Sequence, residues 1–160
     1  MPKKTNFYSS SFLPRRCQKF FEQAKELSVN SDIKRANIGA VAVYKNKIIG
    51  MGYNSYKTHP RQCKYDKYRP LNLAKTSSTL HAIHAEVMCL TSIKKKNIDW
   101  SKVELYIFRS KKESYAGLCR PCPACMQLIK DFGIKHIFYT TDESIAYEYL
   151  YDAYRIKEFT

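Results

Sequence analysis

Apolar residues recur along the chain with two periods, which predict helices in some segments and strands in others. In residues 14–29 the apolar positions are spaced three and four apart, so this segment is expected to form a helix that begins near Pro14. Residues 37–44 form an almost unbroken apolar run, which is typical of a buried strand. A turn at residues 45–47 leads into a second strand at 48–53, so the two strands should form a hairpin.

The second half of the chain alternates between the two patterns. A helix is predicted from His84 to about Lys95, and a strand follows at residues 103–109. The next helix should run from about residue 122 to Phe132 with Gly133 as its C-terminal cap, and a strand is expected at 134–140. Because a helix joins these two strands, they can pair in parallel.

Two patterns overlap in the last twenty residues. Ile145, Tyr147, Tyr149 and Tyr151 alternate as in a strand, whereas Ala146, Tyr149, Leu150, Ala153 and Ile156 recur as in a helix. The polar residues 141–144 are few enough for a tight turn. This favours a hairpin and therefore an antiparallel fifth strand.

Length and charge bound the kind of protein. We expect 160 residues to form one domain, 1–160, with a core that needs no disulfides. The N-terminus lacks an apolar signal region and no apolar run reaches membrane length, so we expect a cytoplasmic protein without a membrane partner. Lys and Arg number 28 against 14 Asp and Glu, which favours anionic partners, either a polynucleotide or a nucleotide phosphate. The 13 Tyr and 8 Phe suggest that some aromatic rings are buried between subunits of a homo-oligomer.

A long connection, residues 55–80, shows no clear apolar period. Its portion from Lys57 to Lys75 holds six Lys or Arg against one Asp, interleaved with Tyr65 and Tyr68. Such a segment can bind single-stranded nucleic acid through phosphate contacts and base stacking. A solvated loop is the alternative.

Two short motifs carry candidate chemistry. The first is His84-Ala85-Glu86, and the second is Pro121-Cys122-Pro123-Ala124-Cys125. Cys122 and Cys125 are three residues apart, so a helix that starts here places both sulfurs on one face, and its N-terminus favours the thiolate. One imidazole and two thiolates match the three protein ligands of a catalytic Zn²⁺ site, which leaves Glu86 available as a base.

Other assignments of these residues remain open. Cys122 and Cys125 could instead form a redox pair or half of a structural zinc site. Cys119 could replace Cys122 as a ligand, and His81 could compete with His84. A second metal site made of His59, Cys63 and His81 is a further alternative.

His-x-Glu followed by Pro-Cys-x-x-Cys is the signature of zinc-dependent base deaminases. In these motifs the chain resembles the cytidine and deoxycytidylate deaminase superfamily, over roughly residues 38–141. The resemblance implies an α/β fold, a three-layer α/β/α sandwich around a mixed five-stranded sheet. It also implies Zn²⁺ held by His84, Cys122 and Cys125, with Glu86 as the catalytic proton carrier.

The resemblance extends to substrate contacts. Gly52-Tyr53-Asn54 is similar to a family pattern in which the Asn contacts sugar or base, although Asn54 could simply form a turn. The backbone of Ala85 would contact the pyrimidine rim. An antiparallel fifth strand resembles the free-cytidine deaminases, and a parallel one resembles the deoxycytidylate, tRNA-adenosine and polynucleotide branches.

These features leave several functions open. We expect deamination of a cytosine nucleotide, with deoxycytidylate as the first choice, although Val87 stands where that branch typically has Asn. Cytosine in single-stranded DNA or RNA is the alternative that the charge favours, and adenine is a less favoured target. A non-catalytic, zinc-stabilised nucleic-acid-binding module is the alternative from another class, and the presence of Glu86 argues against it.

Overall fold

The computed structural model describes residues 5–8, 13–69, 81–112 and 116–150. Its main sheet is mixed, with the strand order β1-β8-β7-β6-β2-β3. Five of these strands form the predicted sheet, and the short β1 is added at its edge. The strands are β1 (Thr5–Tyr8), β2 (Asn37–Tyr44), β3 (Lys47–Tyr53), β6 (Glu104–Ser110), β7 (His136–Thr140) and β8 (Ile145–Tyr149).

The predicted hairpin is formed by β2 and β3, which pair antiparallel. Lys45 and Asn46 connect them, and both residues have positive φ, 49° and 64°. Two-residue loops of this kind match the right-handed twist of the strands that they join. The hairpin prediction is therefore confirmed.

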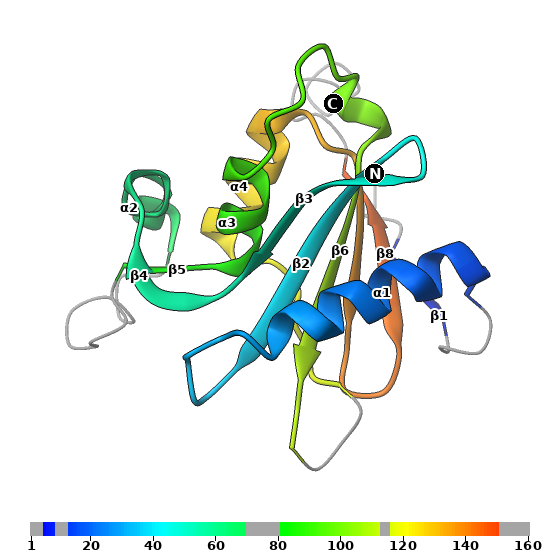
Figure 1. Cartoon of the computed structure of the whole chain (residues 1–160), viewed down its shortest axis with the longest axis horizontal. Coiled ribbons are helices and arrows are strands. Elements are labelled where there is room, and N and C mark those ends of the chain that lie inside the picture. Colours follow the sequence, from blue (N-terminus) through cyan, green and yellow to red (C-terminus); the bar gives the residue numbers. More distant parts are fainter. Residues whose placement is uncertain (1–4, 9–12, 70–80, 113–115, 151–160) are drawn as a thin grey trace, which may run out of the picture.

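Helices cover both faces of the sheet and complete the three layers (Figure 1). Helix α1 (Arg15–Ser28) lies across one face, and helices α3 (Ala85–Thr91) and α4 (Pro123–Phe132) lie on the other. The spacing of Cys17, Phe20, Phe21 and Ala24 places them all on the buried side of α1. In the described part of the chain, no helix has the length and apolar character needed to cross a bilayer.

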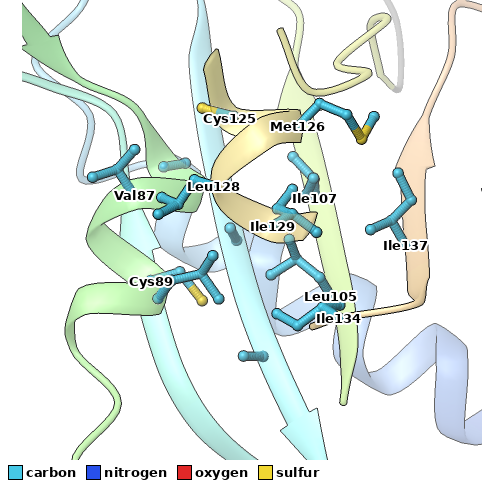
Figure 2. Close-up of a cluster of buried hydrophobic side chains, with 14 of the residues drawn as sticks. Val87, Cys89, Leu105, Ile107, Cys125, Met126, Leu128, Ile129, Ile134 and Ile137 are labelled. Carbon is cyan, nitrogen blue, oxygen red and sulfur yellow. The ribbon is translucent and has the colours of Figure 1, made fainter. Parts of the chain in front are cut away.

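Helices α3 and α4 pack against each other and against the sheet through a buried apolar core (Figure 2). Val87 and Cys89 of α3 face Leu128 and Ile129 of α4 across a layer that also includes Ile107 of β6. All five side chains are at most 1% exposed. Because interiors are close-packed, the starts of the two helices are held in a fixed relation.

The crossover through α4 makes β6 and β7 parallel neighbours, as predicted. Gly133 ends α4 in a left-handed conformation with φ 90°. Strand β8 then pairs antiparallel with β7, which confirms the hairpin prediction for the fifth strand. The competing helical pattern extends to Ile156, beyond the described residues.

The connection after β3, for which the sequence showed no clear period, contains regular secondary structure. It contains a strand, β4 (Ser55–Thr58), a helix, α2 (Pro60–Tyr65), and a 3-10 helix, η2 (Asp66–Tyr68). A two-residue strand, β5 (Ala82–Ile83), pairs with β4. Residues 70–80 of that connection lie outside the described residues.

Helix α3 is shorter than predicted, since it ends at Thr91 rather than near Lys95. The Ser92 hydroxyl donates to the Cys89 carbonyl at 2.6 Å and accepts from the Met51 N–H of β3 at 3.1 Å. This side chain competes with the helical hydrogen bonds and ties the end of the helix to the sheet.

Candidate metal and catalytic site

His84 is the N-cap residue of α3. Its backbone is extended, with φ −81° and ψ 155°, and its carbonyl accepts the first helical hydrogen bond, from Met88. The apolar residues that follow draw α3 onto the sheet, so His84 is delivered to one end of the core. The imidazole is therefore positioned by the packing of the helix behind it.

Cys122 is the N-cap residue of α4, and Pro123 takes the first helical position. Proline suits this place because its fixed φ is helical and its missing N–H would have no intrahelical partner. Cys125 follows in the first turn and is completely buried. The predicted placement of both sulfurs at a helix start is confirmed.

The two helix starts bring three donor atoms together. His84 Nδ1 lies 3.5 Å from Cys122 Sγ and 3.3 Å from Cys125 Sγ. The ligand atoms of the three residues all lie within 4.8 Å of one another. One imidazole and two thiols at this spacing are the borderline-soft donor set that Zn²⁺ prefers, so the residues fit this metal.

Glu86 lies on the buried side of the same cluster. Its side chain is 5% exposed, and the Cys125 thiol donates to its Oε2 at 3.7 Å. Burial raises the pKa of Glu86, and the nearby imidazole of His84 opposes that shift. The carboxyl group is thus enclosed beside the donor atoms, where it can hold a proton.

The donors also alter one another's titration. A side-chain hydrogen bond with Cys125 lowers the pKa of Cys122 to about 4, although burial opposes this shift. Burial lowers the pKa of His84, but the hydrogen bond and charge of Cys122 outweigh it, so the net direction is upward. The lowered pKa favours the thiolate form of Cys122, which is the form that binds metals.

A cleft of about 370 Å³ opens beside the cluster. His84, Glu86 and Cys122 line one part of it, together with Ala85 and Asn54. The cleft is also basic, because four arginines contribute to its walls: Arg35, Arg69, Arg109 and Arg120. A small anionic molecule would find both positive charge and the donor cluster in one cavity.

Asn54 lines the cleft, but both ends of its amide are engaged. Its Oδ1 accepts from the Ile38 N–H at 2.9 Å, and its Nδ2 donates to the Ala36 carbonyl at 2.6 Å. The side chain therefore fixes the segment that leads into β2. Ala85, the other predicted contact, also lines the cleft and is 1% exposed.

The rival ligands do not join the donor cluster. Cys119 is buried with its thiol against the Ile107 carbonyl and Thr140, and burial raises its pKa to about 12. His81 bonds to Asp66 at 2.7 Å instead of joining the donors. Among the described residues, the only group of three or more potential ligands consists of His84, Cys122 and Cys125.

Sequence reasoning did not bring the four arginines of the cleft together, although Arg69 lies in the basic segment predicted to contact phosphates. Arg120 forms two hydrogen bonds with the buried Glu148 of β8, at 2.8 and 3.2 Å. Arg109 donates to the Leu118 carbonyl, while its Nε is buried without a hydrogen-bond partner among the described residues. Arg120 directly precedes the Pro121-Cys122 motif, whereas Arg35 and Arg109 adjoin neither motif.

The sandwich, the His/Cys/Cys cluster and the enclosed carboxyl group define the class of zinc-dependent deaminases. Residues 14–141 match the family described as the cytidine and deoxycytidylate deaminase zinc-binding region. The chain therefore belongs to this family. No curated protein gives a significant match.

Solved structures share the fold at low sequence identity. The apo dCMP deaminase of cyanophage S-TIM5 is 21% identical with a TM-score of 0.56, and the match covers 81% of this chain and 86% of that one. The same phage enzyme with dCMP and dUMP has a TM-score of 0.54, 21% identity and coverage of 80% and 82%. Cytidine deaminase from Burkholderia pseudomallei has a TM-score of 0.52, 15% identity and coverage of 80% and 88%.

Proposed function

We propose that the protein deaminates deoxycytidylate, converting dCMP to dUMP. The family and the donor cluster support hydrolytic deamination, and the observation that carries the choice of a nucleotide is the set of arginines in the cleft. Among solved structures of the same fold, one holds dCMP and dUMP. The predicted cytoplasmic location and homo-oligomeric state stay predictions.

Two of the arginines are the best candidates for phosphate recognition. Arg35 is exposed and forms no ion pair with a described residue, and Arg109 has the buried Nε without a partner among the described residues. Arg120 is balanced by Glu148, and Arg69 lies 3.8 Å from Asp66. A phosphate would pair with the first two, because guanidinium groups present several donors in a plane that suits its oxygens.

The proposed chemistry assigns separate roles to the chain's own residues. His84, Cys122 and Cys125 would hold Zn²⁺, which when bound supplies the Lewis acidity that activates water at neutral pH. Glu86 would take a proton from the attacking water and deliver it to the ring nitrogen N3 as the new C4–O bond forms. It would then move the proton of the C4 hydroxyl to the amino group, so that the C4–N bond breaks, ammonia leaves and a C4 carbonyl remains. Ala85 and Asn54 would border the bound pyrimidine and its sugar.

The orientation of β8 favours a different substrate. An antiparallel fifth strand resembles the free-cytidine deaminases, and β8 is antiparallel to β7. On this alternative the cleft would accept the nucleoside, and its arginines would serve the structure. Arg120 already does so through Glu148, which also accepts from the Tyr139 hydroxyl at 2.8 Å.

Single-stranded nucleic acid is a further candidate, favoured by the surface near α2. Tyr56 and Tyr68 are each 44% exposed, and Lys67 lies over the Tyr68 ring at 5.1 Å. Exposed rings beside lysines can stack bases while the cations contact phosphates. A net charge of +14 would add to this binding.

The test compares substrates on the zinc-loaded protein. Ammonia release would be measured with dCMP, deoxycytidine and a cytosine-containing single-stranded oligonucleotide. Our proposal predicts turnover of dCMP well above that of the other two. Preference for deoxycytidine or for the oligonucleotide would instead support the corresponding alternative, and zinc-loaded protein inactive on all three would support the non-catalytic module.

Variants of the cleft sharpen this test. Arg35→Ala should raise KM for dCMP by about tenfold or more, because a hydrogen bond to a charged group contributes about 1.5–3 kcal/mol. Lys34→Ala removes a neighbouring exposed cation that is not among the residues lining the cleft, so it should leave KM unchanged. Equal effects of the two variants would contradict a phosphate contact at Arg35.

A further inference from the structure

A buried glutamine connects α2 to the start of α3. Gln62 has no exposed surface, and its Oε1 accepts from the backbone N–H of His84 at 2.9 Å. Its Nε2 donates to Asp66 Oδ1 at 2.7 Å. The orientation of the amide is dictated by its partners, since the N–H can only donate and the carboxylate can only accept.

The carboxylate that holds Gln62 is itself fixed. Asp66 Oδ2 lies 2.7 Å from His81 Nδ1, and the Asp66 side chain is only 8% exposed. The same segment is anchored to α4, because the Tyr65 hydroxyl donates to Asp131 Oδ2 at 2.7 Å. Residues 62–66 thus contact the start of one ligand-bearing helix and the body of the other.

From these contacts we propose that Gln62 is a positioning residue for the metal site. The N–H of His84 lies outside the helical hydrogen bonds of α3, so the bond to Gln62 restrains the backbone of this residue on the side that the helical bond from Met88 does not hold. Rotation of that backbone would move the imidazole away from the two sulfurs, which now lie 3.3 and 3.5 Å from Nδ1. Gln62 therefore acts on the metal through His84, without touching it.

The network makes a specific prediction about complementary substitutions. Gln62→Glu keeps an acceptor for His84 but places a second carboxylate against Asp66, and the two would repel. The double variant Gln62→Glu/Asp66→Asn exchanges donor and acceptor, because the amide introduced at position 66 can donate to the carboxylate introduced at position 62. The total charge of the pair is unchanged, and the bond to His84 is retained.

Zinc release and cobalt spectra test the proposal. Zinc loss to an excess of chelator would be followed in Gln62→Met, Gln62→Glu, the double variant and Gln127→Met. Residues that hydrogen-bond to a metal ligand typically contribute about 10–100-fold to metal affinity. Zinc loss should therefore be at least about tenfold faster in both Gln62 single variants. The double variant should return toward the wild-type rate. Gln127 bonds to Asp131 on the exposed side of α4, so Gln127→Met serves as the matched control.

The cobalt-substituted proteins supply a readout of ligand geometry. The visible absorption of Co²⁺ should change in the Gln62 single variants and should match the wild type in the double variant and in Gln127→Met. A uniform loss of thermal stability with unchanged zinc release and unchanged spectra would overturn the positioning role and leave Gln62 as an ordinary buried residue. Gln62→Glu has nearly the wild-type volume and keeps the test decisive if Gln62→Met does not fold.

This inference rests on the proposed zinc ligands, but it does not depend on which cytosine compound is the substrate. A wild-type protein without thiolate-to-cobalt charge-transfer absorption would refute the ligand assignment itself. A wild-type protein with that absorption, whose Gln62 variants release zinc at the wild-type rate, would refute only the role of Gln62. The two failures are therefore distinguishable.

Discussion

At the residue scale, Glu86 is the group whose environment most clearly suggests chemistry. A structural zinc site needs no carboxyl group, yet the Glu86 carboxyl group is enclosed next to the donor cluster. Burial raises the pKa of Glu86. Glu86→Gln keeps the size and the hydrogen-bonding capacity but cannot carry the proton. We expect turnover to fall by about 10²–10⁴-fold, the usual contribution of general acid–base catalysis.

Zinc content and ammonia release should be measured together for this variant. Metal at the wild-type level with lost turnover would separate proton transfer from metal binding. Glu104→Gln makes the same chemical change on the opposite face of the sheet, where Glu104 pairs with Arg16, and it should remain active. Wild-type turnover in Glu86→Gln would remove this residue from the proposed mechanism.

The choice between Cys122 and Cys119 is a second question at this scale. Cys119→Ser should retain about one zinc per chain, because its thiol faces a carbonyl and a hydroxyl and its pKa of about 12 keeps it protonated. Cys122→Ser should lose most of its zinc, since an alcohol is a poor replacement for a thiolate ligand. Metal analysis after dialysis measures both. Retention by Cys122→Ser together with loss by Cys119→Ser would reverse the assignment.

The donors could be predicted from the sequence because each lies in a short motif at a helix start. Gln62 and Arg35 could not, since each reaches the site through a fold that brings distant segments together. Asn54 shows a different limit. Asn54 lies beside the cleft, but its two bonds to the backbone at the start of β2, to Ala36 and Ile38, become visible only in the structure.

At the element scale, the close approach of α3 to β3 determines where the metal site lies. Gly52 of β3 faces the backbone of α3 so closely that an added Cβ would lie 2.3 Å from the Cys89 nitrogen and 2.5 Å from the Ala85 carbonyl oxygen. These are backbone atoms, so they cannot move aside as the end of a side chain can. Gly52→Ala should push α3 away from the sheet and displace His84 with it.

We therefore expect Gly52→Ala to lower the free energy of unfolding by about 3 kcal/mol or more, at the upper end for overpacking. Zinc affinity should fall as well. Gly117→Ala is the control, because its Cβ would meet chiefly the flexible end of Lys111 at 2.8 Å. Chemical denaturation and chelator competition check both variants, and equal stability of the two would contradict a tight α3–β3 contact.

Elements with strong apolar periods were predicted correctly, including α1, the β2–β3 hairpin and α4. Helix α2 was missed because its six residues are too few to show a period. Its local signal was the pair His59-Pro60, since the His59 imidazole caps the helix by accepting from the Arg61 N–H at 3.1 Å and proline takes the first position. The end of α3 could not be predicted, because it depends on Ser92 contacting β3.

At the scale of the whole molecule, a net charge of +14 acts on every anion in solution, whatever the cleft binds. On our proposal the surface charge attracts polynucleotides without presenting their bases to the site. A labelled single-stranded oligonucleotide should then bind at about 50 mM salt and lose most of its affinity by about 200 mM, because neutralised phosphates release counterions. Turnover of dCMP should change far less over this range, since it depends on a few contacts within the cleft. Fluorescence anisotropy and ammonia release, measured on the same preparation, follow the two quantities separately. Oligonucleotide binding that persists at the higher salt and competes with dCMP would place the strand in the cleft and favour a polynucleotide substrate.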